Sequence, residues 1–146
     1  MLEKLRTRSR EESGFTLVEL LVVMLILGIL AAIAIPAFFS QRDKAKDSDA
    51  KAQANSAQTA IESYATDNNG SYAAATLAKL QAIEPTIKSV VSVPSPTSNT
   101  YTVTATSTTG NTFSVTRAST GAVTYPCDSS SGSASAGCPS SGFWNP

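Results

Sequence analysis

The sequence predicts an α+β protein in which a long N-terminal helix, apolar in its first half and amphipathic in its second, packs on a C-terminal antiparallel sheet of about three to four strands. Three observations predict this fold class. An almost wholly apolar run extends from Phe15 to Phe39. Apolar residues then recur at helical spacing as far as Tyr64. After residue 100, apolar and hydroxyl side chains alternate in short segments separated by glycine-containing turns.

The apolar run is long enough to cross a membrane as a helix. A bilayer core of roughly 30 Å needs about 20 residues at about 1.5 Å per residue, and a helix satisfies its own backbone groups in lipid. One charged residue, Glu19, interrupts the run. The segment before it carries Lys4, Arg6, Arg8 and Arg10. This excess of basic residues predicts that the N-terminal end faces the cytoplasm.

The border between the polar head and the apolar run is sharp. In a secretory signal, the small residues of the cleavage site follow the apolar stretch. Here Gly14 precedes it, so a cut after Gly14 would remove only the polar head and leave the apolar helix in place. A carboxylate in a lipid-facing helix usually has a partner. A new α-amino group at Phe15 of a neighbouring copy would fit Glu19.

The segment from Gly14 to Leu20, with the sequence GFTLVEL, resembles the class III signal of type IV pilins and type II secretion pseudopilins. The resemblance implies that a prepilin peptidase cleaves after Gly14 and methylates Phe15. It also implies that Glu19 pairs with the N-terminus of the adjacent subunit, and Pro36 resembles the helix-kinking proline of the family. The fold implied is type IV pilin-like.

The same resemblance implies the partners and the location. The partners are further copies in a helical filament, the peptidase, the inner-membrane assembly machinery and, before assembly, the membrane itself. The subunit begins as a single-pass membrane protein and ends in an extracellular pilus on the cell surface. The domains expected are a removed leader (1–14), a transmembrane or filament-core helix half (15–39) and an extracytoplasmic globular domain (40–146). The globular domain is divided into a helix half (40–67), a connecting region (68–99), a sheet (100–125) and a C-terminal loop (126–146).

The second half of the long helix should present a small-residue stripe to the sheet. Five residues share one helical face: Ala50, Ala54, Ala57, Ile61 and Tyr64. The charged residues near its start are expected to form a solvated surface of weak ion pairs. These residues are Arg42, Asp43, Lys44, Lys46, Asp47, Asp49 and Lys51. Gly70 is expected to follow the end of the helix.

The rest of the chain should cover the helix with a meander. A second short helix is predicted from Tyr72 to Pro85, and an edge strand or extended connector from Ile87 to Val93. Three strands follow, and period-2 alternation gives them one buried face. That face should carry Tyr101, Val103, Phe113, Val115, Val123 and Tyr125.

The segment from Pro126 to Pro146 is expected to lack regular structure, because serine and glycine dominate it. Its two cysteines, Cys127 and Cys138, indicate a disulfide in an exported domain, with two free thiols as the alternative. In pilins, a disulfide-bounded C-terminal loop resembles this one. Phe143 and Trp144 are expected to dock on the domain, with an exposed tip as the alternative.

Composition argues against an enzyme and against a nucleic-acid binder. The 146 residues include no histidine, and 11 basic side chains balance 11 acidic ones. No arrangement of a nucleophile and a base, and no phosphate-binding loop, is apparent, and no cofactor or metal is expected. Two alternatives to a pilin remain. One is a pseudopilin of a type II secretion or DNA-uptake system, and the other is a single-pass membrane-anchored binding domain.

Overall fold

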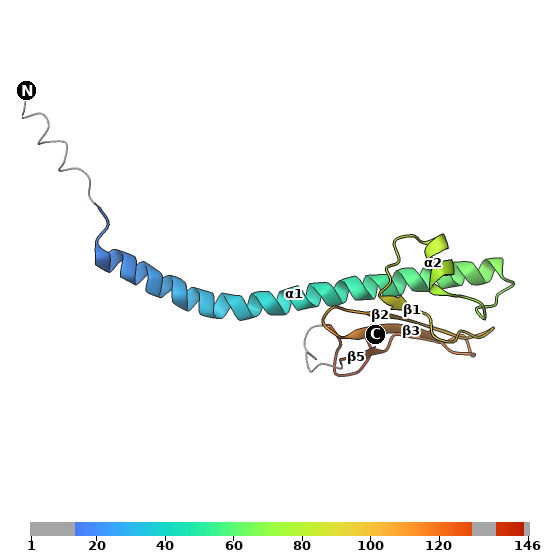
Figure 1. Cartoon of the computed structure of the whole chain (residues 1–146). Helices are drawn as coiled ribbons and strands as arrows, with labels where there is room; N and C mark the ends of the chain where they lie inside the picture. Colours follow the sequence, from blue (N-terminus) through green and yellow to red (C-terminus); the bar gives the residue numbers. More distant parts are fainter. Residues whose placement is uncertain (1–13, 130–136, 145–146) are drawn as a thin grey trace, which may run out of the picture. The chain divides into compact units, whose positions relative to one another are not determined.

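The computed structural model describes residues 14–129 and 137–144. The chain divides into two compact units, Met1–Phe39 and Ser40–Pro146. One helix, α1 (Leu17–Asp67), runs through both (Figure 1). Most of the predicted leader and the serine-rich stretch 130–136 lie outside the described residues.

In the first unit, α1 is an uncovered apolar helix. Every side chain from Phe15 to Phe39 is exposed. By length and composition, the helix could cross a membrane. Pro36 lies inside it. Because proline has no N–H group, the carbonyl of Ala32 loses its usual helical partner.

The second unit contains one antiparallel sheet. Its strands are β1 (Val91–Ser92), β2 (Tyr101–Thr106), β3 (Thr112–Arg117), β4 (Val123–Thr124) and β5 (Cys127–Asp128). The order β1-β2-β3-β4 is a meander, and β5 also pairs with β3. β4 pairs at the Thr116 end of β3, whereas β5 pairs at the Thr112 end. The predicted α+β fold class, with its antiparallel meander, is confirmed.

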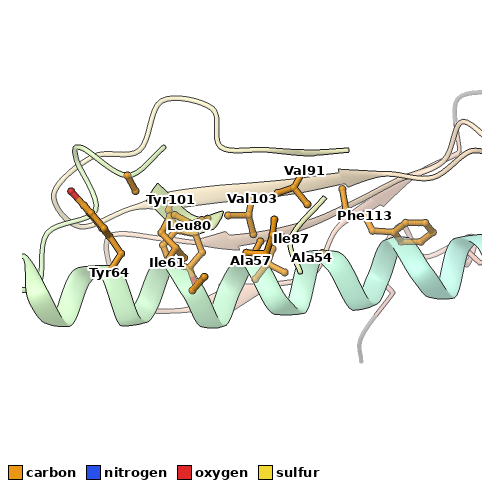
Figure 2. Packing of buried hydrophobic residues seen from close by; sticks show 14 of the residues in the cluster. Ala54, Ala57, Ile61, Tyr64, Leu80, Ile87, Val91, Tyr101, Val103 and Phe113 are labelled. Carbon is orange, nitrogen blue, oxygen red and sulfur yellow. The ribbon is translucent and has the colours of Figure 1, made fainter. Parts of the chain in front are cut away.

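The core lies between the second half of α1 and one face of this sheet. All five residues of the predicted stripe are buried, and Ala54, Ala57 and Ile61 are fully so. Figure 2 shows the side chains of Ala54, Ala57 and Ile61 on the face of α1 that lies toward Val103 and other sheet residues. Because alanine is small, the backbone of the helix can approach the sheet closely, and Tyr101, Val103, Phe113 and Val115 fill the facing layer. Two further residues of the predicted face, Val123 and Tyr125, are only partly buried.

The connecting region is less helical than the sequence predicts. Helix α2 spans only Leu77–Ile83, because Thr76 caps it by accepting a hydrogen bond from the N–H of Lys79. Tyr72 lies outside the helix and packs edge-on against Tyr101, with 4.8 Å between ring centroids. Of the predicted edge strand or connector, only Val91 and Ser92 form a strand, the edge strand β1, because a turn at Ser89 and Val90 comes just before it.

Glu62 of α1 forms hydrogen bonds that join the helix to the sheet. Its Oε1 accepts hydrogen bonds from the Tyr101 hydroxyl (2.9 Å) and from Nη1 of Arg117 (3.1 Å). Its Oε2 accepts one from the Tyr72 hydroxyl (2.8 Å). Burial raises the pKa of Tyr101 strongly, and the hydrogen bond and negative charge of Glu62 raise it further. The pKa of Tyr72 is raised by the same causes.

Asp47 corrects the expectation of a solvated charged surface. Its side chain is fully buried, whereas the neighbouring Asp49 is exposed. Its carboxylate accepts hydrogen bonds from the Thr109 hydroxyl (2.5 Å) and from Nδ2 of Asn111 (2.7 Å). Gly137 lies so close that a Cβ there would sit 2.6 Å from the Asp47 Cβ. The turn between β2 and β3 and the residue before Cys138 therefore close over this carboxylate.

The C-terminal segment is more ordered than predicted. The disulfide between Cys127 and Cys138 is present, as expected. However, Cys127 also belongs to β5, so the prediction of no regular structure is wrong there. Trp144 docks, since its Nε1 donates to the carbonyl of Ser114 (3.0 Å) and its ring meets Phe113 and Tyr125 edge-on. Phe143 forms a β-bridge with Pro126 through its backbone, and its side chain remains about half exposed.

Candidate processing and assembly site

The predicted cleavage junction lies in exposed, non-helical chain. Gly14 and Phe15 precede the first residue of α1, and both are exposed. A Cβ added at Gly14 would meet no atom within 4 Å. Packing inside this chain therefore does not require glycine at this position. A requirement for glycine would have to come from a molecule that binds the junction.

Thr16 and Glu19 form a capping box at the start of α1. The backbone N–H and the hydroxyl of Thr16 both donate to Oε2 of Glu19, each at 3.0 Å. In return, the N–H of Glu19 donates to the Thr16 hydroxyl oxygen at 3.1 Å. The carbonyl of Thr16 accepts the first helical bond, from Leu20. These reciprocal bonds satisfy N–H groups that the first turn of a helix otherwise leaves unpaired.

In the uncut chain, the carboxylate of Glu19 is thus held by its own chain. Oε1 has no hydrogen bond among residues 14–129 and 137–144, so one carboxylate oxygen is still available for a second partner. The predicted site residues include Glu19 but not Thr16. The spacing of threonine and glutamate three residues apart, just before an apolar run, is the signal that could have found it.

The remaining predicted site residues lie apart from this pair. Pro36 is within α1, 17 positions after Glu19 in the sequence and surrounded by exposed apolar side chains. Cys127 and Cys138 are in the second unit. The first unit therefore combines the predicted cleavage junction, a carboxylate that caps the helix and a long uncovered apolar surface. Exposed apolar surface of this extent marks a membrane or protein contact.

Comparison with known proteins identifies the N-terminal region. The family model described as the prokaryotic N-terminal methylation motif matches residues 9–35. Type II secretion system core protein G of Pseudomonas aeruginosa is 46% identical over 59 residues, which are 40% of this chain and 42% of that protein. No solved structure matches the chain.

Two pilus proteins also match part of the chain. The type IV major pilin protein PilA of Myxococcus xanthus is 49% identical over 51 residues, or 35% of this chain and 23% of that protein. The type IV wide pilus major component PilA4 of Thermus thermophilus is 45% identical over 60 residues, which are 41% of this chain and 46% of that protein. The matches span less than half the length of these relatives. The methylation motif, the long helix and the sheet together are of the prepilin type, and over part of its length the chain is similar to type IV pilins and type II secretion pseudopilins.

Proposed function

We propose that this chain is a structural subunit of a type IV pilus-like filament and not an enzyme. The observation that carries the proposal is the methylation motif with Glu19 held at the start of an uncovered apolar helix. Prepilin peptidase cleaves after Gly14 and methylates Phe15. The leader (1–14) is lost, residues 15–39 anchor the subunit in the membrane, and residues 40–146 form the extracytoplasmic domain.

Assembly then transfers the apolar half of α1 from lipid to other copies of the same helix. The methylated amine at Phe15 is positively charged, and it pairs with Glu19 of the adjacent subunit. An unpaired carboxylate in an apolar fibre core is strongly disfavoured, so the pair also fixes the axial register. Pro36 leaves one carbonyl unbonded, which lets the packed helices bend locally. The inner-membrane assembly machinery performs the transfer, and the filament emerges on the cell surface.

A pseudopilin function is the second candidate. It is favoured by the similarity to type II secretion system core protein G. In that case the same processing and pairing build a short fibre within the envelope. The disulfide between Cys127 and Cys138 favours the pilin, since the resemblance associates a disulfide-bounded loop with pilins.

The experiment that tests the proposal is intact-mass spectrometry of material sheared from the cell surface. A species that begins at Phe15, one methyl group heavier and two hydrogens lighter for the disulfide, is expected. Processed protein found only in membranes would favour the pseudopilin. A chain that still begins at Met1 in every fraction would overturn both and leave a membrane-anchored binding domain. Substitution of Gly14 provides the matched control, because it should abolish the change in mass.

A further inference from the structure

A polar pocket lies in the second unit, where α1 and β3 both end. Its volume is about 240 Å³, and it is lined by Gly70, Tyr72, Asn99, Arg117, Ser119 and Gly121. Gly70 and Gly121 have positive φ values of 79° and 86°. A side chain would be strained at either position, so these two walls consist of backbone. The pocket belongs to no part of the assembly site described above.

The guanidinium group of Arg117 is held in a fixed orientation at this pocket. Nη1 donates to Glu62, and the guanidinium carbon lies 5.9 Å from the centroid of the Tyr72 ring. Glu62 is itself fixed by the hydroxyls of Tyr72 and Tyr101. The side chain of Arg117 is about one-third exposed. Contacts from three segments therefore orient a cation that solvent can still reach.

The edge of Arg117 that faces away from Glu62 is open. Nε and Nη2 form this edge, and within the described residues neither donates a hydrogen bond. A Cβ added at Gly121 would lie 3.9 Å from Nη2, which places this nitrogen beside the glycine wall of the pocket. Two parallel N–H groups on one guanidinium edge match the two oxygens of a carboxylate.

The neutral groups around the pocket suit a hydroxylated ligand. Asn99 and Ser119 are exposed, and among the described residues neither side chain has a hydrogen-bond partner. An amide and a hydroxyl can donate to and accept from sugar hydroxyls. Pockets for drug-sized ligands have volumes of about 300–1,000 Å³, so a space of about 240 Å³ suits one sugar ring.

We propose that this pocket binds a single uronic acid ring, with its carboxylate on the Nε–Nη2 edge of Arg117 and its hydroxyls on Asn99 and Ser119. Glu62 already neutralises part of the charge of Arg117, and the site is open to solvent. The expected affinity is therefore in the range of about 1 mM. The site would act whether or not the chain forms filaments, so its test is separate from that of the filament function.

The test uses the full chain in a detergent without a sugar head group. D-glucuronate and D-galacturonate are titrated while the side-chain NMR signals of Arg117 and Asn99 are followed. Glucose and galactose supply the same ring without the carboxylate, and acetate supplies the carboxylate without the ring. We expect saturable shifts with the uronates, and at least about tenfold weaker effects with each control.

Two variants test the assigned contacts. Arg117→Lys keeps the charge that pairs with Glu62 but removes the bidentate Nε–Nη2 edge. We expect this variant to bind uronates at least about tenfold more weakly. Asn99→Ala with Ser119→Ala changes only exposed side chains, so it should fold normally. This double variant should bind uronates about three- to tenfold more weakly, and its response to acetate should be unchanged.

Four results would overturn the proposal. They are equal binding of glucose and glucuronate, equal binding of acetate and glucuronate, unchanged binding in Arg117→Lys, and no binding of either uronate. If uronates do not bind and the full chain self-associates in an Arg117-dependent manner, the occupant of the pocket is a carboxylate of a second copy.

Discussion

The side chain of Glu19 has two alternative partners: Thr16 of its own chain, and, in the proposed filament, the N-terminal amine of a neighbouring copy. In the uncut chain Glu19 is held by the hydroxyl and the N–H of Thr16. Proposed assembly adds a charged amine from a neighbouring copy, which brings an opposite charge to the carboxylate, whereas the two Thr16 donors are neutral. The amine can share Oε2 or use the free Oε1. The capping box would therefore orient Glu19 before the proposed assembly without preventing the proposed intersubunit pair.

We predict that Glu19→Ala leaves cleavage and methylation largely intact and impairs filament assembly. The junction at Gly14 and Phe15 is outside the helix, and among the described residues the Glu19 side chain makes its hydrogen bonds to Thr16, whereas the proposed fibre contact uses the carboxylate. Intact mass of the membrane fraction measures processing, and sheared yield measures assembly. A normal yield of filaments from this variant would contradict the pairing mechanism.

Thr16→Val should reduce the sheared yield less than Glu19→Ala does. Valine removes the hydroxyl but leaves the carboxylate available to a neighbouring copy. Thr16→Ser retains the hydroxyl and serves as the matched control, with a yield near that of the parent chain. If Thr16→Val abolished assembly as fully as Glu19→Ala, the capping hydroxyl itself would be essential to the fibre contact.

In the second unit, the buried side chain of Asp47 contributes to stability through its hydrogen bonds. Asp47→Ala would leave the side-chain amide of Asn111, buried with it, without its acceptor, and the cost is about 1–3 kcal/mol. For a domain of about a hundred residues, this corresponds to a fall in Tm of at least about 4 °C. Asp49→Ala, two residues away and exposed, should change stability by less than about 0.5 kcal/mol. Thermal unfolding of the full chain in detergent compares the two, and equal Tm values would contradict the buried role of Asp47.

At the scale of elements, the alanine stripe of α1 sets how closely helix and sheet approach. Ala57 is fully buried against the sheet, whereas Ala52 on the same helix is exposed. The close approach leaves little room for larger side chains, because protein interiors are densely packed. This packing also explains why Asp47, on the same face, is buried with hydrogen-bonding partners and not solvated.

Ala57→Leu should therefore destabilise the domain by about 1–3 kcal/mol through overpacking. Ala52→Leu adds the same side chain to the exposed face and should change stability by less than about 0.5 kcal/mol. Chemical denaturation of the full chain in detergent provides the comparison. A similar effect of both substitutions would indicate that helix propensity, and not contact with the sheet, decides the result.

Burial of Tyr101 and Tyr72, together with their hydrogen bonds to Glu62, makes the packing of α1 on the sheet sensitive to alkaline pH. The pKa values of Tyr101 and Tyr72 are raised in the folded chain, whereas tyrosines in the unfolded chain ionise near pH 10. Their contribution to stability is complete below about pH 10 and is lost as the pH rises from there toward the folded pKa values. Stability should therefore decline above about pH 10. The variant with Tyr72→Phe and Tyr101→Phe should show a shallower decline, and an identical slope would contradict this assignment.

At the scale of the whole molecule, the C-terminal segment is held at several points. The disulfide joins β5 to Cys138, the N–H of Cys127 donates to the carbonyl of Gly142, and Trp144 docks on the sheet. The cysteines are separated by 11 positions. Closing a loop of this length restricts the unfolded chain, which stabilises the folded one by about 3 kcal/mol.

Replacing both cysteines by serine should lower the stability of the domain by about 2–4 kcal/mol. Cleavage after Gly14 should be unaffected, because the junction belongs to the first unit. Denaturant unfolding measures the loss, and intact mass reports processing. An unchanged unfolding midpoint would mean that the contacts of Trp144 suffice to hold the segment.

The sequence determined the features that depend on local pattern. Continuous hydropathy from Phe15 to Phe39 predicts the uncovered helix, because a domain of about a hundred residues has no core large enough to enclose a helix that is apolar on every side. Period-3.6 and period-2 patterns likewise predict the stripe of α1 and the facing residues of β2 and β3. The disulfide between Cys127 and Cys138 follows from the expectation that the domain is exported.

Only the tertiary structure decided where distant segments meet. Asp47 reads as one more surface charge until the turn after β2 brings Asn111 to it. In the sequence, Arg117 is only the last residue of a strand. In the structure, contacts with Glu62 and Tyr72 orient its guanidinium group at a pocket. The two-residue β5 forms because Cys127 is placed beside β3, which no alternation of side chains could indicate. Hydropathy patterns record which face of an element is buried, whereas the contacts of Asp47 and Arg117 join residues 117 − 72 = 45 or more positions apart in the chain.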